Sequence, residues 1–378
     1  LDALHDSISD HIRLMEHNWQ QADWPEFRYD LSGIEGELLA FAEKAGQVGG
    51  LLRALPEADR KQAVADVLVS EAIKTSEIEG EFLSRPDVVS SVRNQLGLAR
   101  EPEPVRDLKS AGAAELAVQV RESWDAALSE ACLFDWHRTL LQGVRLNDLG
   151  CWRSQVSTMQ VISPGIGDPV VHFEAPPSEQ VPREMQAFIG WFNGSRSHLK
   201  QGPVRAALAH LYFESIHPFE DGNGRIGRAI SEKALSQGLG RPVLLSLSRA
   251  IEAERSGYYE ALKQAQRSNE VTEWIVYFLR TILRAHEQTE QLVEFVLKKT
   301  QFFDRYRDEL NERQLKVVRR ILEAGPEGFE GGINARKYKN LTEVSKATAT
   351  RDLQDLVGKG VLRPIGAGRS ARYDLNPG

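Results

Sequence analysis

Residues 217–228 read HPFEDGNGRIGR, and the rest of the chain is best understood in relation to this segment. It follows an apolar run from Val204 to Ile216, so it should lie against a core and not on a solvated tail. Pro218 should end the preceding helix, and Gly222 and Gly224 let the backbone turn sharply and approach a ligand closely. We therefore expect a tight, ligand-facing turn between two packed elements.

The residues after this turn predict a helix whose N-terminus can bind an anion. Apolar residues at helical spacing begin with Ile226 and Ala229. The Gly-Asn-Gly sequence at 222–224 leaves backbone N–H groups pointing outward at the positive end of that helix. Arg225 and Arg228, three residues apart, project from one side of the helix and present guanidinium groups suited to phosphate oxygens. These features together indicate a phosphate site.

Asp221 and His217 add groups that a phosphate site alone does not require. Asp221 has the wrong charge to hold phosphate, but it fits if Mg²⁺ bridges its carboxylate to the phosphates, as this ion usually does. A single histidine at the end of an apolar helix is more often a hydrogen-bonded core residue than a catalyst, yet the charged groups around His217 favour catalysis. A metal-only site is an alternative, because His210, Glu214 and His217 fall at i, i+4 and i+7, although the chain has no second Glu-x-x-His.

The segment 217–228 resembles the Fic (filamentation induced by cAMP) signature, H-P-F-x-[DE]-G-N-[GK]-R-x-x-R, at every fixed position. The resemblance implies a mainly α fold, a Fic-type helical bundle with a β-hairpin flap, and transfer of AMP from ATP to a Ser, Thr or Tyr hydroxyl of a target protein. In this family the matching histidine is the general base, so His217 would take the proton from the attacking hydroxyl, and Asp221 would hold Mg²⁺. The residues implied to bind ATP are Gly222, Asn223, Gly224, Arg225, Ile226, Gly227 and Arg228.

A second motif lies at the end of a predicted helix at about residues 57–80. Thr75 and Glu79 are four apart and so face the same way, and Gly80 is placed to end the helix. A carboxylate in the last turn is unfavourable with the helix dipole, so Glu79 would gain from a cation outside its own helix, although its spacing also fits a solvated surface acid. The hexamer that starts at Thr75 resembles the inhibitory motif [ST]-x-x-x-E-[GN] of many Fic proteins. The resemblance implies that Glu79 pairs with Arg228, fills the space of the ATP γ-phosphate and makes the protein N-terminally autoinhibited.

Two short runs typical of β-strands flank a Gly- and Pro-rich turn between residues 150 and 177, and they predict a hairpin. The resemblance places a hairpin flap at this point of the chain, over the active site, where its exposed edge can pair with a segment of the target protein by strand addition. The residues expected to dock the target are Thr158, Val161, Val171 and Phe173. An ordinary structural hairpin is the alternative.

Further helices are expected on either side of these motifs. Tyr259 lies on one of them and, by the same resemblance, near the nucleotide base, so it could stack on adenine or pack in the core. His137 lies on another and is expected to be packed or exposed, not catalytic. The expected helices are one before residue 24 and others at 31–45, 108–121, 131–142, 181–191, 203–216, 226–239, 250–266 and 271–299.

The chain changes character after residue 302. Three short helical segments precede two strands joined by a basic turn, and this order resembles a winged helix-turn-helix. Residues 335–378 hold nine Lys or Arg and four Asp or Glu, a surplus of +5, which permits contact with DNA, although many winged helices contact proteins instead. The residues on or just before the recognition helix are Thr348, Thr350, Arg351 and Gln354. The helices are expected at 311–323, 341–347 and 349–358, and the strands at 361–365 and 371–375.

Composition limits the class of protein. The 378 residues carry a net charge of −7 and a pI near 5.8, which indicates a soluble protein that is not generally nucleic-acid-binding. Cys132 and Cys151 are too few for a disulfide framework, so a cytoplasmic location is expected. No apolar run reaches membrane-spanning length, and no membrane partner is expected. We expect a homodimer of three-domain chains, with an N-terminal helical region (1–100), a catalytic core (101–300) and a winged-helix domain (301–378).

The leading functional hypothesis is a Mg²⁺-dependent protein adenylyltransferase that modifies a hydroxyl of a target protein, its own hydroxyls included. A second enzyme hypothesis is hydrolysis of AMP from a modified protein, with Glu79 positioning the water. A hypothesis of a different class is a DNA-binding regulator whose helical bundle senses a nucleotide. Members of the Fic family also transfer UMP, phosphocholine or phosphate; Gly224 and the uninterrupted signature favour ATP as the donor.

Overall fold

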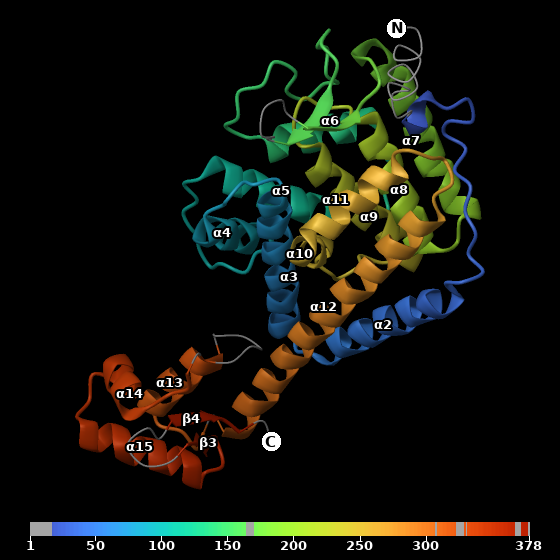
Figure 1. Ribbon diagram of the computed structural model, residues 1–378. Coiled ribbons are helices and arrows are strands. Elements are labelled where there is room, and N and C mark those ends of the chain that lie inside the picture. Colours follow the sequence, from blue (N-terminus) through green and yellow to red (C-terminus); the bar gives the residue numbers. More distant parts are fainter. Residues whose placement is uncertain are drawn as a thin grey trace, which may run out of the picture. The chain divides into compact units, whose positions relative to one another are not determined.

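The computed structural model describes residues 17–163, 170–306, 308–322, 329, 331–366 and 372–376. The described chain is mainly helical, as expected, with four short strands in two antiparallel pairs (Figure 1). Its contacts divide it into two compact units: a larger unit, Leu1–Gly46 with Val64–Glu287, and a C-terminal unit, Gln47–Ala63 with Gln288–Gly378. This division falls inside a long helix, at residue 287, whereas domain boundaries at 100 and 300 remain a prediction.

Most helices of the larger unit begin at residues suited to a helix start. Ser84, Asp107 and Ser129 each accept backbone N–H groups through a side-chain oxygen and so cap α4, α5 and α6. The helices up to residue 306 are α2 (Glu35–Ala54), α3 (Glu57–Ile78), α4 (Arg85–Gln95), α5 (Leu108–Glu122), α6 (Glu130–Leu140), α7 (Val181–His198), α8 (Gly202–Ile216), α9 (Asn223–Leu239), α10 (Leu247–Ala253), α11 (Arg255–Ala265) and α12 (Thr272–Tyr306), with 3₁₀ turns η1 (Asn18–Gln20) and η2 (Ser178–Gln180).

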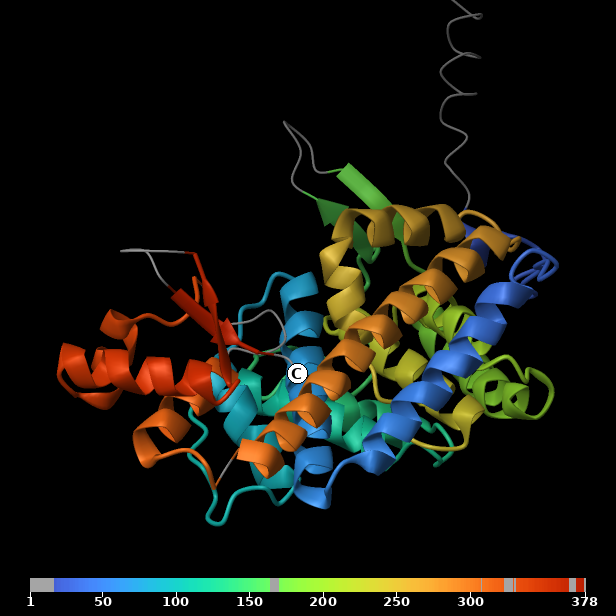
Figure 2. The same ribbon diagram turned by 90° about the horizontal axis from the view of Figure 1, so that it is seen from below.

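Helix α8 is the centre of the larger unit. All of its residues are buried, which is typical of a helix that other helices surround. Its most extensive packing partner is α9, and α5, α6 and α7 contact one or other helix of this pair. Figures 1 and 2 show the remaining helices of the unit arranged around α8 and α9. The turn at 217–222 is therefore held between two packed helices, as predicted.

Two predicted helices have wrong bounds. The helix predicted at 31–45 is α2, which continues to Ala54 through Gly46 and the Gly49-Gly50 pair. Burial of Phe41, Ala45 and Val48 along one face outweighs the helix penalty of about 1 kcal/mol for each glycine. The helix predicted at 250–266 is two helices, because Glu254 leaves the helical region with φ −130° and ψ 41°.

Helix α4 was not predicted, although Ser84 and Pro86 are start signals of the expected kind. The helix predicted before residue 24 is represented in the described residues by the turn η1, since residues 1–16 lie outside them. The other helices predicted in this part of the chain are present, with ends that differ by several residues at most.

Strands β1 (Gln160–Ser163) and β2 (Val170–Glu174) pair antiparallel, with Gln160 opposite Glu174 and a bulge between Val161 and Ile162. The connecting residues 164–169, which carry the predicted Gly- and Pro-rich turn, lie outside the described residues. Figures 1 and 2 show the pair at one edge of the larger unit. Its role as a docking flap remains a prediction.

The C-terminal unit has the predicted order of three helices and two strands. They are α13 (Glu312–Leu322), α14 (Ala335–Thr342), α15 (Lys346–Gly358), β3 (Leu362–Ile365) and β4 (Arg372–Leu375). The helix predicted at 341–347 was wrong, because Asn334 caps α14 earlier in the chain and Glu343 ends it with φ 58°. Ser345 then caps α15, accepting from the Thr348 N–H group at 3.2 Å. Classification as a winged helix remains a prediction.

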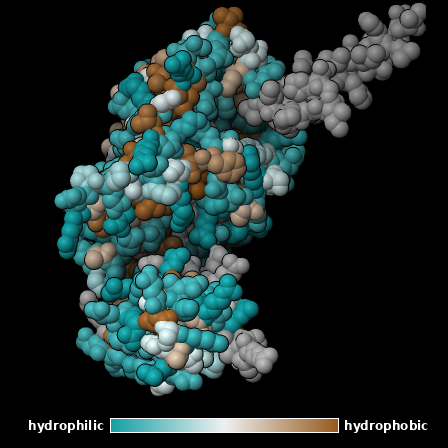
Figure 3. Space-filling model, turned by 90° about the vertical axis from the view of Figure 1, so that its left-hand side faces the viewer, coloured by the Kyte–Doolittle hydropathy of each residue, from teal (hydrophilic) through white to brown (hydrophobic). Residues whose placement is uncertain are grey.

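The surface is largely hydrophilic where Figure 3 shows it, with small apolar patches between polar side chains. Phe82 and Val156 are among the large apolar side chains that are strongly exposed in the described residues. None of the described helices is long and apolar enough to span a membrane.

Candidate active site

His217 stands where α8 ends and the chain turns toward α9. Its backbone is left-handed, with φ 50° and ψ 60°, and its N–H group still donates to the Phe213 carbonyl oxygen at 2.9 Å. Such a conformation costs a residue other than glycine about 1–3 kcal/mol, and it persists where the surrounding structure holds it. The His217 side chain is 14% exposed, so its imidazole can be reached from solvent.

Arg153 is the buried residue that holds this strained turn. Its Nε atom donates to the His217 carbonyl oxygen at 2.8 Å, and its backbone N–H group donates to the Pro218 carbonyl oxygen at 2.9 Å. Its terminal nitrogens donate to the Pro176 carbonyl oxygen at 2.5 Å and to Oγ of Ser178 at 2.8 Å. Burial lowers the pKa of Arg153 to about 10, which still leaves it charged at neutral pH. No sequence pattern singles out Arg153.

The turn is closed by the side chain of Asn223. Its Oδ1 atom accepts from the Phe219 N–H group at 2.9 Å, and its Nδ2 atom donates to the Phe219 carbonyl oxygen at 2.8 Å. Both ends of the amide thus bind one residue across the loop. In this state the Asn223 side chain shapes the turn, and its contact with ATP stays a prediction.

His137 supports the same turn from α6. Its ring stacks on Phe219 with 4.1 Å between centroids, and its Nδ1 atom accepts from the Gly150 N–H group at 2.9 Å. The proton is therefore on Nε2, which donates to the Asp221 carbonyl oxygen at 3.1 Å. Burial lowers the pKa of His137, which keeps the ring neutral. His137 is packed, one of the two outcomes expected, and it holds Asp221 in place.

Glu79 lies directly on the N-terminus of α9. That helix begins after Gly222, whose φ is 85°. A Cβ atom on Gly224 would lie 2.2 Å from Oε1 of Glu79, so glycine is needed for the carboxylate to come so close. This is the position at which the helix N-terminus was predicted to bind an anion. The anion found there belongs to the protein itself.

Arg228 of α9 binds both Glu79 and Thr75 of α3. Its NH2 atom donates to Oε1 of Glu79 and to the Thr75 carbonyl oxygen, both at 2.8 Å, and its Nε atom donates to Oγ1 of Thr75 at 2.9 Å. The side chain is 1% exposed, and its NH1 atom has no hydrogen-bond partner among the described residues. Burial alone would lower the pKa of Arg228, but the Glu79 carboxylate outweighs burial and raises it. Gly80, with φ 82°, ends this segment as predicted.

A second carboxylate of the same segment, Glu81, pairs with the other arginine of the turn. Arg225 is 3% exposed, and its NH1 atom binds Oε2 of Glu81 while its NH2 atom lies 3.2 Å from Oδ1 of Asp221. Lys109 of α5 holds the other oxygen of Glu81 at 2.8 Å. Both arginines that were predicted to bind phosphate are therefore occupied by carboxylates from the end of α3.

Family models match two separate segments of the chain. Residues 127–235 match the Fic/DOC family. This Fic/DOC segment contains α7, α8 and the whole signature turn. Residues 17–98, which contain α3 and Glu79, match a different model, a domain of unknown function (DUF4172).

Curated relatives align with part of the chain only. The protein adenylyltransferase Fic of Culex quinquefasciatus is 33% identical over 162 residues, 42% of this chain and 28% of that protein. The protein adenylyltransferase Fic of Nematostella vectensis is 32% identical over 114 residues, 30% of this chain and 24% of that protein. The chain thus spans about a quarter of the length of these relatives.

Two solved structures share the fold. A Fic family protein from Desulfovibrio desulfuricans G20 has a TM-score of 0.52 at 18% identity, and the match covers 93% of this chain and 98% of that one. A Fic domain containing signaling protein from Bacteroides thetaiotaomicron VPI-5482 also has a TM-score of 0.52, at 20% identity over 69% of this chain and 98% of that one. A Fic-type helical fold is therefore present.

Tyr259, predicted to stack on adenine or pack in the core, contacts Ile78 and Glu79. Its hydroxyl is 3.3 Å from the Ile78 carbonyl oxygen and 3.4 Å from Oε2 of Glu79. Burial and the nearby Glu79 charge raise the pKa of Tyr259 to about 12. Tyr259 is nonetheless 36% exposed, so it borders the candidate site and is not part of the core. Stacking on adenine remains a prediction.

The four residues predicted to dock a target fall in different environments. Thr158 is exposed, whereas Phe173 is buried, with its ring 4.8 Å from that of His17 in an edge-on arrangement. The side chains of Val161 and Val171 lie outside the described residues, although the backbones of both take part in the β1–β2 ladder. Docking of a target by these four residues remains a prediction.

Asp221 fits a magnesium ion that is shared with a nucleotide. Its side chain is 50% exposed, and Oδ1 takes both the Gly222 N–H group at 2.6 Å and Arg225. Among the described residues no group of three or more His, Cys, Asp or Glu side chains could hold a metal ion. The remaining ligands would thus come from phosphates and water, as Mg²⁺ commonly requires. The metal-only alternative is not supported, because His210, Glu214 and His217, all described in the structure, do not form such a group.

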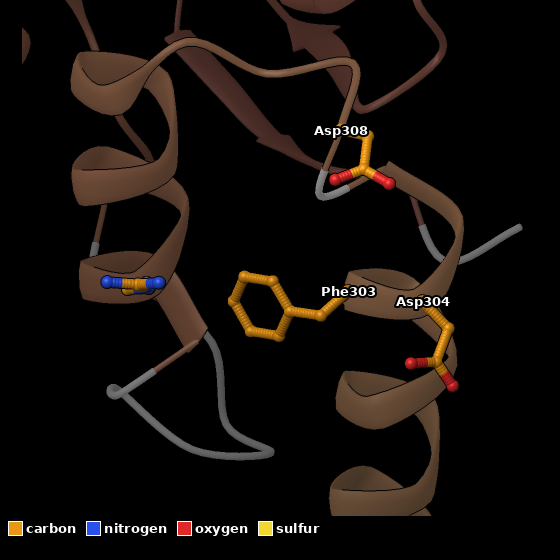
Figure 4. A pocket seen from close by; sticks show the side chains of 4 residues that line it. Phe303, Asp304 and Asp308 are labelled. Carbon is orange, nitrogen blue, oxygen red and sulfur yellow. The ribbon is translucent and has the colours of Figure 1, made fainter.

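The C-terminal unit has hollows of its own. Figure 4 shows one of about 430 Å³, lined by Phe303, Asp304, Asp308 and Arg319, with the Phe303 ring pointing into the space between two helices. Another, of about 630 Å³, lies along α15 and is lined by Lys346, Ala347, Thr350, Arg351 and Gln354. The second hollow contains three of the four residues predicted on the recognition helix.

Proposed function

We propose that the protein is an ATP-dependent protein adenylyltransferase that transfers AMP to a hydroxyl of a target protein. The observation that carries the proposal is the turn 217–228, which brings a reachable imidazole, a carboxylate and two buried arginines to the N-terminus of α9. The curated relatives that align with part of the chain are named protein adenylyltransferases, which supports the proposal.

In the proposed reaction the hydroxyl oxygen of the target attacks the α-phosphorus of ATP. His217 takes the hydroxyl proton, the bond between the α-phosphorus and the bridging oxygen to the β-phosphorus breaks, and pyrophosphate leaves with that electron pair. Arg225 and Arg228 offset the charge of the phosphates, and the N–H groups of the α9 terminus bind their oxygens. Orientation does most of the catalysis, since phosphoryl transfer requires little covalent chemistry from the protein.

Mg²⁺ would be held by Asp221 together with phosphate oxygens and water. When bound, the ion neutralises part of the phosphate charge. His137 contributes indirectly, because its bond to the Asp221 carbonyl oxygen fixes the backbone that presents the carboxylate.

We infer that the state described here is autoinhibited. Glu79 occupies the anion site over Gly224 and pairs with Arg228 at 2.8 Å. A triphosphate that used the same helix terminus and the same arginine would meet a carboxylate in its place. Like charges at this distance repel strongly in a partly buried site. ATP could then bind only in a form unsuited to transfer.

Glu81 should act as a second inhibitory carboxylate. The Glu81 carboxylate neutralises Arg225. Its removal in Glu81→Gln should therefore raise AMP incorporation about threefold to tenfold over the wild type, less than a change at Glu79. Incorporation of labelled AMP into protein measures this. Glu103→Gln, whose glutamate pairs with Arg93 instead, is the matched control and should have no effect. If Glu81→Gln matches the wild type while a Glu79 variant is active, Arg225 is not restrained by Glu81.

The target hydroxyl would be presented along the β1–β2 pair. A two-stranded sheet offers edge N–H and C=O groups, which can align an extended segment without a strict side-chain code. A cytoplasmic location and a homodimer remain predictions from the sequence.

The proposal is tested by supplying the Glu79→Gly protein with a lysate and, separately, with labelled ATP, UTP, CDP-choline or GTP. Labelling of protein from ATP alone supports adenylyl transfer. Labelling from another donor alone would mean that the protein transfers the group of that donor instead of AMP. Hydrolytic removal of AMP from a pre-modified protein, lost in Glu79→Gly, would favour the reverse reaction.

A second activity, DNA binding, is favoured by the hollow along α15. Lys346 and Arg351 line it together with polar Thr350 and Gln354, a set suited to phosphates and base edges. The protein should bind duplex DNA with an affinity that falls steeply with salt, and Arg351→Ala should reduce the logarithmic salt slope by about one. Lys359→Ala is the control, because Lys359 pairs with Asp355 at 2.6 Å. Absence of binding at about 50 mM salt would contradict this activity and favour a protein partner.

A further inference from the structure

Glu214 is a buried carboxylate directly behind His217. It lies on α8 one turn before the histidine, and its side chain is 6% exposed. Its Oε2 atom is 3.6 Å from Nδ1 of His217, and its Oε1 atom has no hydrogen-bond partner among the described residues. Burying an ionised carboxylate without full hydrogen bonding is costly, so a glutamate at this position requires an explanation.

The packing around Glu214 is adapted to its carboxylate. A Cβ atom on Gly227 of α9 would lie 2.5 Å from Oε1 of Glu214, so a larger residue there would collide with it. The same atom would lie 3.2 Å from Nδ1 of His210, whose other ring nitrogen contacts the Tyr258 hydroxyl of α11. Gly227, which the resemblance assigned to ATP binding, therefore also makes room for this carboxylate.

The groups around Glu214 keep it ionised. Burial would raise the pKa of Glu214, but the neighbouring His217, His210 and Arg228 outweigh burial and lower it. Burial lowers the pKa of His210, so that ring is neutral near pH 7, and Arg228 is already paired with Glu79. Of these neighbours, His217 is the one whose charge changes in the proposed reaction.

We propose that Glu214 is a positioning residue for His217, an inference that rests on the proposed transfer of AMP. Glu214 accepts a hydrogen bond from Nδ1–H of His217 and so presents Nε2, free of a proton, to the acceptor hydroxyl. As the hydroxyl oxygen bonds to the α-phosphorus, its proton moves to Nε2 and the imidazole becomes a cation. The negative charge of Glu214 stabilises that cation, and Glu214 itself stays ionised throughout.

The 3.6 Å separation between Glu214 and His217 fits a resting state. Catalytic hydrogen bonds are often long before substrate binds and shorten in the reacting complex. The left-handed backbone of His217, fixed by Arg153, holds the imidazole within reach of Glu214 along the same helix. A purely structural role would not explain why a buried carboxylate lies 3.6 Å from the imidazole of the proposed base.

In the Glu79→Gly background, Glu214→Gln should lower kcat on the order of 10²-fold. It should leave KM for ATP within about twofold, because no phosphate contact is removed. The acid limb of the kcat/KM pH profile should move to lower pH, since a neutral amide no longer favours the protonated imidazole. Glu214→Asp, which keeps the charge, should recover part of the rate.

A readout that does not depend on catalysis is ¹⁵N NMR of histidine-labelled protein. In the parent, His217 should carry its neutral-state proton on Nδ1, and in Glu214→Gln it should take up the second proton at a lower pH. Glu184→Gln is the matched control, because Glu184 is a buried glutamate of α7 that accepts from Nε1 of Trp24 at 3.0 Å. It should change neither the rate nor the His217 titration.

The proposal is overturned if Glu214→Gln leaves both the rate and the His217 titration unchanged. It is also overturned if activity is lost with an unshifted pH profile and a raised KM for ATP, because that pattern marks structural damage. If the Glu79→Gly parent transfers no AMP at all, the proposed function fails. The NMR titration of His217 would still decide whether Glu214 acts on the imidazole.

Discussion

The Glu79→Gly variant should incorporate AMP into protein on the order of 10- to 100-fold faster than the wild type. In the wild type the Glu79 carboxylate lies over Gly224 and holds Arg228 at 2.8 Å, so the N-terminus of α9 already has its anion. Removing the carboxylate frees both the helix terminus and the guanidinium group for the phosphates of ATP. The rate is measured from labelled ATP with the protein itself or a lysate as acceptor.

The same variant should be less stable than the wild type. Arg228 is 1% exposed and would lose its only carboxylate partner among the described residues, keeping its bonds to Thr75. Leaving a buried charged group less well paired costs about 1–3 kcal/mol, so a lower Tm should accompany the higher activity. A gain in activity together with a lower Tm would show that the variant is more active because inhibition is released, and not because the fold is more stable.

Glu77→Gly controls for a glycine in the last turn of α3. Glu77 pairs with Lys74 at 2.6 Å, and its loss should loosen the helix end without freeing Arg228. Equal activity of the wild type and Glu79→Gly would remove the autoinhibition claim. Loss of AMP removal in Glu79→Gly, with no gain in transfer, would instead identify Glu79 as the group that positions water for hydrolysis.

His217→Asn should abolish AMP transfer in the Glu79→Gly background, with a fall in rate of at least about 10³-fold. Asparagine tolerates the left-handed backbone at this position, φ 50° and ψ 60°, better than alanine does, so the turn should keep its shape. Binding of ATP with Mg²⁺, measured by calorimetry, should persist, because Arg225, Arg228 and Asp221 are unchanged.

The combination of lost transfer and retained binding is what marks His217 as the base. Loss of both AMP transfer and ATP binding would indicate that the turn had collapsed. His217→Ala would then also lose transfer and binding, with a lower Tm. Transfer at near the parental rate in His217→Asn would place the base elsewhere and contradict the proposed reaction.

The sequence predicts those parts of the site that lie within one short stretch. Residues 217–222 form the predicted turn because Gly222 supplies a positive φ, and α9 begins directly after it. The spacing of Thr75 and Glu79 predicted that both face the same way at a helix end. Glu79 directly follows Ile78, the last residue of α3, and both Thr75 and Glu79 contact Arg228. The family resemblance identified Arg228 as their partner, because the spacing of Glu79 alone fits a solvated surface acid equally well.

Arg153 and Glu81, which act across long sequence separations, were missed. Arg153 binds the carbonyl oxygen of His217 across 64 positions, and Glu81 binds Arg225 across 144. Neither residue belongs to a periodic pattern, and each looks like an ordinary surface charge until the fold brings its partner near. Glu214 was considered only as a possible metal ligand. Its spacing from His210 and His217 shows which face of the helix it lies on, but not which atoms of other residues its carboxylate contacts.

Helix bounds failed where packing overrides local signals. Gly46 and the Gly49-Gly50 pair do not end α2, because buried neighbours on the same face keep the chain helical. Conversely, the caps Asn334 and Ser345 set the starts of α14 and α15, although the apolar pattern suggested later bounds. Capping chemistry was readable in the sequence, whereas burial became clear only from the fold.

The central claim is that the turn at 217–228 directs a hydroxyl to the α-phosphorus of ATP. It is tested most directly by giving the Glu79→Gly protein ATP labelled on either the α- or the γ-phosphate. The account predicts that α-label becomes bound to protein with release of pyrophosphate, and that His217→Asn binds none. Transfer of the γ-label, or no transfer of either label by a protein that binds ATP, would contradict it.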